Sequence, residues 1–78
     1  MHDSPAKPKA NEMIVLRTLP HGLLDGLPEE DQQAIRAVVG KPILLLGYDA
    51  EGRAELEFTD SEGVLHAIFV KSGYLSRP

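Results

Sequence analysis

Residues 49–63 read DAEGRAELEFTDSEG and contain two near-copies of one turn, Asp49-Ala50-Glu51-Gly52 and Asp60-Ser61-Glu62-Gly63. In each copy Asp opens a type I turn, and Gly follows three places later, where the backbone needs a positive φ that glycine adopts at little cost. Between the turns, residues 53–59 alternate polar and apolar side chains, as in a strand with one buried and one wet face. The stretch therefore predicts an antiparallel meander of three strands over residues 42–71.

A single helix is predicted ahead of the meander, over residues 28–39. Pro28 suits the first helical position, and the acidic residues 29–31 complement the positive end of the helix dipole. Gly40 and Pro42 then end the helix. Its apolar residues follow helical spacing and predict a stripe that packs on the sheet, since so short a helix does not persist alone. The stripe consists of Ala34, Ile35, Val38 and Val39.

The remaining segments complete one small domain over residues 13–76. Residues 13–19 are rich in branched side chains and predict a first strand, and GLLDGL at 22–27 predicts a compact turn whose leucines point inward. Residues 1–12 hold two prolines and little to bury, so a disordered tail is expected there. At 78 residues the chain is near the lower limit for a self-sufficient core.

Composition excludes several classes of function. Residues 25–62 carry ten carboxylates against Arg36, Lys41 and Arg53, within a chain of net charge −4, so neither nucleic acid nor an anionic membrane is an expected partner. Cysteine is absent, which removes thiolate nucleophiles and cysteine-ligated metals. The first residues hold no apolar signal core, and no apolar run reaches membrane-spanning length. We expect a cytoplasmic protein.

The candidate chemical groups do not form a recognisable active site. The carboxylates Glu51, Glu55, Glu57, Asp60 and Glu62 lack the spacing of an EF-hand loop. His66 is the one histidine inside a predicted element, and no serine has the strand-to-helix context of an activated nucleophile. The glycines form no phosphate-binding loop. We therefore predict a protein that is not an enzyme and has no catalytic, cofactor or metal site.

Two strand registers remain open, and they differ in what they bury. If each turn is a three-residue loop with a glycine bulge, the core face carries Ala54, Leu56, Phe58, Leu44, Leu46, Tyr48, His66, Ile68 and Val70. If the loops hold an even number of residues, the flanking strands bury Ile43, Leu45, Leu65, Ala67 and Phe69. In that second case His66 faces water across from Glu57. The Asp-x-Glu-Gly sequence favours the bulged loop.

The order of elements, strand, turn and helix, three strands and a short closing turn, resembles SH3-like small barrels. The segment AIFVKSGYL at 67–75 resembles the end of an SH3 domain, where a strand meets a Ser-x-Tyr 3₁₀ turn and a short last strand. Three further segments are similar to a small bacterial domain of uncharacterised function: GLPEEDQQAI (26–35), VGKP (39–42) and GYDAEGRAELEF (47–58). The resemblance covers residues 13–75 and implies a mostly β, α+β fold closed into a small SH3-like barrel.

The SH3 resemblance does not extend to proline-rich peptide binding, which needs an aromatic-lined groove. Trp is absent, and only Tyr74 stands where such a groove residue is expected. The surplus of apolar positions instead indicates a protein-interaction module that docks on a protein partner or on a second copy. In the favoured register the exposed patch is formed by Ile43, Leu45, Leu65 and Phe69, with a rim of Glu55, Glu57 and Arg53. The alternative is a small-molecule or cation sensor that uses the acidic sheet face and His66.

Overall fold

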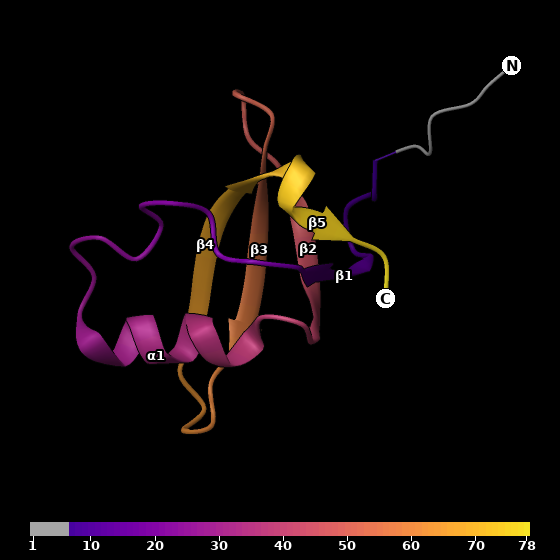
Figure 1. The fold of residues 1–78 in the computed structure, drawn as a ribbon. Helices are drawn as coiled ribbons and strands as arrows, with labels where there is room; N and C mark the ends of the chain where they lie inside the picture. Colours follow the sequence, from indigo (N-terminus) through magenta and orange to yellow (C-terminus); the bar gives the residue numbers. More distant parts are fainter. Residues whose placement is uncertain (1–6) are drawn as a thin grey trace, which may run out of the picture.

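The computed structural model describes residues 7–78 and forms a small α+β fold with one helix and a five-stranded antiparallel sheet (Figure 1). The elements follow one another as β1 (Met13–Leu16), α1 (Glu29–Val38), β2 (Pro42–Tyr48), β3 (Arg53–Thr59), β4 (Leu65–Lys71), the 3₁₀ turn η1 (Ser72–Tyr74) and β5 (Leu75–Ser76). Within the sheet the strand order is β4-β3-β2-β1-β5. The predicted elements are therefore present, in the predicted order.

Both Asp-x-x-Gly turns adopt the predicted bulged loop. Gly52 and Gly63 have φ values of 81° and 84°, the left-handed region that glycine occupies without a Cβ clash. The N–H of Asp60 donates to the carbonyl of Val64 at 2.9 Å, and the N–H of Gly63 donates to the carbonyl of Asp60 at 3.0 Å. β3 and β4 then pair without interruption, with Phe58 opposite His66. The predicted register of this hairpin is confirmed.

The register of β2 differs from the prediction because a β-bulge interrupts its pairing with β3. Tyr48 lies opposite Ala54, as expected, but the register shifts between Leu45 and Gly47, so that Leu45 lies opposite Leu56. An extra residue in one strand reverses which of the following side chains face the core. Ile43 and Leu45 are consequently buried, whereas Leu44 and Leu46 are only half-buried.

Helix α1 begins one residue later than predicted, since Pro28 occupies the N-cap position with ψ of 154° instead of the first helical turn. The side-chain amide of Gln32 donates to the carbonyl of Leu27 at 2.9 Å and ties the helix start to the preceding turn. Ala34 and Ile35 are buried against the sheet, and Val38 and Val39 are half-buried beside them. The apolar stripe thus packs as its spacing predicted.

The core lies between the meander β2–β4 and the elements that cross its inner face. In Figure 1, α1 crosses in front of the lower ends of the meander strands, β1 and β5 lie across β2, and the segment that follows β1 runs across β3 and β4. Buried side chains from both layers form one cluster, whose largest fully buried members are Ile14, Leu16, Ile35, Leu45 and Leu56. The inner face of the sheet is therefore covered, and its outer face is turned to solvent.

The sheet is not closed into a barrel, contrary to what the SH3 resemblance implied. The two end strands of the sheet, β4 and β5, are joined by η1, but they pair with β3 and β1 respectively and not with each other. The expected 3₁₀ turn and short last strand are present. Because the sheet stays open, one edge of β4 has no neighbouring strand among residues 7–78.

The expected N-terminal tail lies only partly within the described residues, because residues 1–6 fall outside them. Residues 8–12 run beside β2. There the N–H of Asn11 donates to the carbonyl of Leu45 at 2.7 Å, and the Tyr48 hydroxyl donates to the carbonyl of Pro8 at 2.8 Å. These contacts hold residues 8–12 against the sheet, although the composition predicted a disordered tail for them.

Candidate interaction surface

Strand β4 presents an apolar strip on the outer face of the sheet. The residues Leu65, Ala67 and Phe69, called the outer strip below, are all exposed, because β4 points its other side chains, Ile68 and Val70, into the core. The exposed fraction is 60% for Leu65 and 42% for Phe69. Leaving large apolar side chains in water is unfavourable by about 25 cal/mol per Å², so the strip is a candidate contact surface.

The predicted rim residues lie beside the outer strip on β3. Glu55 lies directly opposite Phe69, and Glu57 lies opposite Ala67. The guanidinium carbon of Arg53 lies 5.5 Å from the centroid of the Phe69 ring, a distance typical of a cation–π contact. An apolar strip is thus flanked by charged side chains on the same face of the sheet, as in many protein interfaces.

Two of the seven predicted patch residues lie elsewhere. Ile43 and Leu45 have exposed fractions of 5% and 0% and belong to the core, because the bulge in β2 turns them inward. Both are core residues, and the prediction that they belong to the exposed patch was wrong. The outer strip and its rim therefore comprise Leu65, Phe69, Glu55, Glu57 and Arg53 from the prediction, together with Ala67.

His66 is held on the inner side of β4 by contacts from two other elements. Its Nε2 lies 2.9 Å from Oδ2 of Asp60 in the β3–β4 turn, and its Nδ1 lies 3.6 Å from Oδ1 of Asp31 in α1. Because an ionised carboxylate only accepts hydrogen bonds, the Nε2–H of His66 donates to Asp60. The ring also stacks on Phe58, with 5.2 Å between centroids. Both ring nitrogens thus face carboxylates, and the ring connects β4 with the β3–β4 turn and with α1.

Asp60 links the β3–β4 turn to His66, and these contacts favour its ionised form. The hydrogen bond from His66 is the largest cause that lowers the pKa of Asp60 below its usual value of 3.8, followed by the hydrogen bonds that the N–H groups of Val64 and Glu62 donate to its carboxylate. Hydrogen bonds to a charged carboxylate stabilise that charged form. The Asp60 carboxylate is therefore part of what holds this turn in place.

A pH dependence of stability follows from the lowered pKa of Asp60. The unfolded chain takes up the Asp60 proton at a higher pH than the folded chain does, so this contribution is complete above about pH 4 and is lost as the pH falls through the folded pKa. Asp60→Asn removes the ionisation but keeps an oxygen that accepts from Glu62 and Val64. We expect the difference in unfolding free energy between the parent protein and Asp60→Asn to shrink as the pH falls below about 4.

Urea unfolding followed by circular dichroism between pH 7 and pH 2.5 measures this difference. Glu62→Gln is the matched control, because it removes a carboxylate from an exposed residue of the same turn. The difference between the parent protein and this control should not follow the pH profile of Asp60→Asn. A constant difference for Asp60→Asn over the whole range would show that the Asp60 charge does not stabilise the fold.

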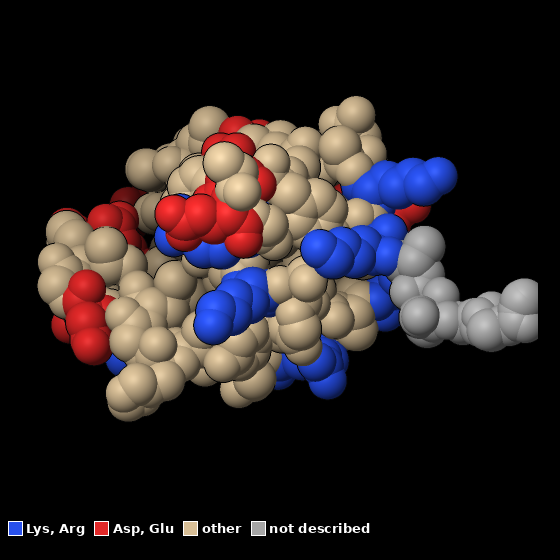
Figure 2. All heavy atoms as spheres, turned by 90° about the horizontal axis from the view of Figure 1, so that it is seen from above, with Lys and Arg blue, Asp and Glu red and all other residues tan. Residues whose placement is uncertain are grey.

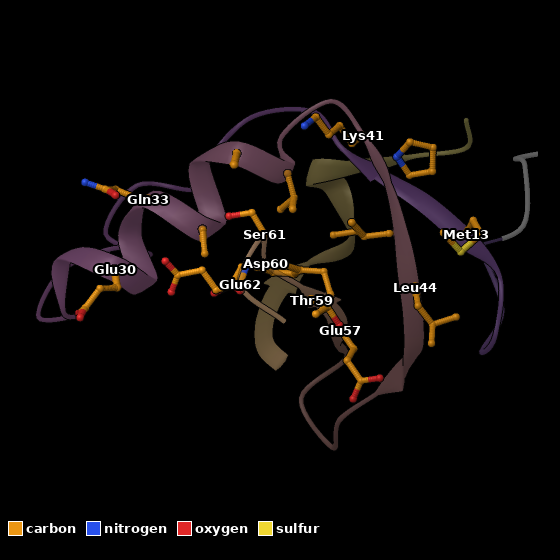
Figure 3. A pocket seen from close by; sticks show the side chains of 16 residues that line it. Met13, Glu30, Gln33, Lys41, Leu44, Glu57, Thr59, Asp60, Ser61 and Glu62 are labelled. Atoms are coloured by element: carbon orange, nitrogen blue, oxygen red, sulfur yellow. The ribbon is translucent and has the colours of Figure 1, made fainter. Parts of the chain in front are cut away.

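A groove of about 810 Å³ crosses the end of the molecule between α1, the start of β2 and the β3–β4 turn. Its lining combines apolar side chains such as Phe58, Ile43 and Ala34 with four carboxylates and one lysine. Figure 3 shows Glu30 on the helix, Glu62 and Asp60 in the turn, Glu57 on β3 and Lys41 on the opposite side. The carboxylates give this groove an acidic character that suits a cationic ligand better than an anionic one.

Charge is divided between the two sides of the molecule. In Figure 2, Lys and Arg side chains gather mainly on the side where β1 and β5 lie in Figure 1, and Asp and Glu side chains occupy the centre and the opposite side. The acidic side contains the start of α1, with Glu29, Glu30 and Asp31. Basic residues in the sequence lie mainly near its ends, outside residues 25–62. The acidic clustering predicted from the sequence is thus also a clustering in space.

The part of the chain that the structure describes contains neither a membrane-spanning helix nor a metal-binding cluster. Among residues 7–78, no helix is long and apolar enough to cross a membrane. The same residues contain no cluster of three His, Cys, Asp or Glu side chains arranged to hold a metal ion. Comparison with protein-family models, with curated proteins and with solved structures found no match for this chain. A proposal for the function of this chain therefore depends on the geometry of its described residues alone.

Proposed function

We propose that this chain is a non-enzymatic protein-interaction module that docks on a protein partner through the outer strip of β4. The observation that supports the proposal is the exposure of Leu65 and Phe69, at 60% and 42%, on a strand with one unpaired edge. An apolar strip with the polar neighbours Glu55, Glu57 and Arg53 has the composition of an interface centre with its rim. A protein partner covers such a strip and removes its apolar area from water.

Position-specific photo-crosslinking in the native cell tests this proposal. A benzophenone amino acid in place of Phe69 is expected to yield a covalent adduct of defined mass, because the side chain would lie inside the contact. The same amino acid in place of Arg36, an exposed residue of α1, is the control and should yield no such adduct. Leu65→Lys should reduce the adduct at position 69 severalfold by placing a charge within the contact. Equal labelling at both positions, or none, would contradict docking through β4.

The acidic groove supports a second candidate function, a sensor for a cation or a cationic small molecule. Carboxylates of Glu30, Glu57 and Glu62 line the groove together with apolar side chains, and a flexible polyamine would neutralise them. Mg²⁺ is the contrasting probe, because no three acidic or histidine side chains among residues 7–78 are arranged to hold a metal ion. An NMR titration with spermidine and, separately, with Mg²⁺ distinguishes this candidate from the first. Saturable shifts at Glu57 and Phe58 support the sensor, while unchanged spectra at millimolar ligand leave the interaction module as the single candidate.

A further inference from the structure

In the part of the chain that the structure describes, strand β4 is the long free edge of the sheet. It occupies one end of the strand order, and all seven of its residues pair with β3 without a bulge. The strand at the other end, β5, has only two residues. A long flat edge presents backbone N–H and C=O groups that another strand can use. The edge of β4 is therefore a place where a sixth strand can be added.

The phase of the β3–β4 ladder identifies which backbone groups face outward. The N–H of Asp60 donates to the carbonyl of Val64, and antiparallel ladders alternate between bonded and non-bonded pairs. His66, Ile68 and Val70 therefore direct their backbone groups toward β3, while Leu65, Ala67 and Phe69 direct theirs to the free edge. Among residues 7–78, no backbone group from another segment bonds to these three. The outer strip thus combines exposed apolar side chains with unpaired backbone groups.

Over residues 64–70 the edge also lacks the features that usually keep strands apart. Natural edge strands are protected by Lys, Pro, inward-pointing charges or bulges. Residues 64–70, VLHAIFV, contain no Pro and no Asp, Glu, Lys or Arg, and their pairing with β3 has no bulge. The one nearby lysine, Lys71, stands at the end of the strand. The local chemistry therefore favours the addition of a strand that is itself uncharged and apolar.

We propose that the partner strand is β4 of a second copy, and that the two strands pair antiparallel about a two-fold axis at Ala67. This inference rests on the proposed function and names the partner of the same surface. An antiparallel pair joins residues whose outward backbone groups face each other, so odd-numbered residues pair with odd-numbered ones. Centring the axis on Ala67 places Leu65 beside the second copy's Phe69, and Phe69 beside the second copy's Leu65. Each of the two exposed apolar side chains then gains an apolar cross-strand neighbour on the outer face.

Two further features fit this register. The turn residues Pro20–Leu23 line a hollow together with Phe69–Lys71, and their place beside this end of the strand limits the proposed pairing to residues 65–69. With the axis at Ala67, Lys71 lies just beyond the paired residues, at the end where the second copy's Glu62 and Gly63 lie. No like charges meet along residues 64–70, because these residues carry no Asp, Glu, Lys or Arg. A self-complementary strip of this kind gives the closed interface that two-fold dimers require.

The oligomeric state of the full chain and of Ala67→Pro tests the proposal. Sedimentation over a hundredfold concentration range is expected to show a mass that rises from 8.5 kDa toward twice that value. Ala67→Pro removes an outward N–H and no bond to β3, and proline is tolerated on edge strands. It should be a folded monomer with unchanged circular dichroism. Ala67→Val keeps the N–H and is the matched control, which should still dimerise. If Ala67→Pro proves unfolded, Leu65→Lys takes its place.

A cysteine at the proposed axis provides a second, register-specific readout. The chain has no cysteine, so Ala67→Cys is expected to form a disulfide-linked dimer on mild oxidation, since paired Cα atoms across an antiparallel ladder lie within disulfide range. Ala50→Cys, in an exposed turn residue, should form it at least tenfold more slowly. Equal rates, or a monomer at every concentration, would overturn self-pairing.

The mass of the photo-adduct at position 69 separates the failure of self-pairing from the failure of the proposed function. An adduct of twice the chain mass supports self-pairing. An adduct with a different protein overturns self-pairing but leaves the interaction module intact. The absence of any adduct at position 69 contradicts both.

Discussion

Leu45→Ala is expected to lower the free energy of unfolding by about 3 to 5 kcal/mol, the range of fully buried leucines truncated to alanine. Leu45 has no exposed surface and packs in the main cluster with Leu56 and Ile14. A domain of this size has a total stability of roughly 4 to 12 kcal/mol, so the variant should be near the limit of folding. Urea unfolding followed by circular dichroism measures the change as a lower midpoint.

Leu65→Ala is the matched control for this prediction, because it makes the same chemical change on the outer face of the same sheet. Leu65 is 60% exposed, so its truncation should change the unfolding free energy by about 0.5 kcal/mol or less. The measurement should be made at low protein concentration, where association does not contribute to stability. Equal losses for Leu45→Ala and Leu65→Ala would contradict the bulged register of β2 that buries Leu45.

Ile35→Ala is expected to lower the free energy of unfolding by about 2 to 4 kcal/mol and to release α1 from the sheet. Ile35 is 1% exposed and, with Ala34, forms the buried face of the helix. A helix of ten residues is marginal without tertiary contacts, so loss of this anchor should also reduce helical circular dichroism at 222 nm before global unfolding. Hydrogen exchange of the α1 amides should rise more than that of the β3 amides.

Gln33→Ala is the control for Ile35→Ala, since Gln33 is an exposed residue of the same helix. Its side-chain amide donates to the Glu29 carboxylate at 3.2 Å, an exposed pair that contributes only a few tenths of a kcal/mol. Alanine has a higher helix propensity than glutamine and offsets part of that loss. The expected change is therefore below about 0.5 kcal/mol. If both variants lose equal stability, the helix is not anchored through Ile35.

The proposed contact through β4 depends on the open sheet. Had β4 and β5 paired and closed a barrel, the backbone groups of Leu65, Ala67 and Phe69 would have found partners within the chain. Because the strand order ends at β4, these groups face outward beside exposed apolar side chains. A charged residue in the outer strip would disrupt both its apolar surface and its ability to pair, which makes Leu65→Lys a severe test of either proposal.

Five of the six residues of the outer strip and its rim were predictable from local chemistry. The Asp-x-x-Gly turns determine the β3–β4 register because glycine at Gly63 permits the positive φ that a bulged loop needs. That register places Leu65 and Phe69 on the outer face beside Glu55 and Glu57. The same reasoning misplaced Ile43 and Leu45, since both faces of β2 are apolar and burial does not distinguish them. The isolated Gly47 within the strand was the available signal for a bulge.

By itself, the sequence determined the local features of this protein: which segments form strands, where the helix lies, which turns carry a positive φ, and that negative charge gathers in residues 25–62. Each of these depends on neighbours along the chain, through backbone sterics, side-chain alternation and helical spacing. Tertiary structure decided which side chains of β2 are buried and that one edge of β4 stays open. It also decided which two carboxylates lie beside His66. These depend on packing between segments distant in sequence, where one extra residue in a strand reverses the faces and closure of the sheet is a property of all five strands together.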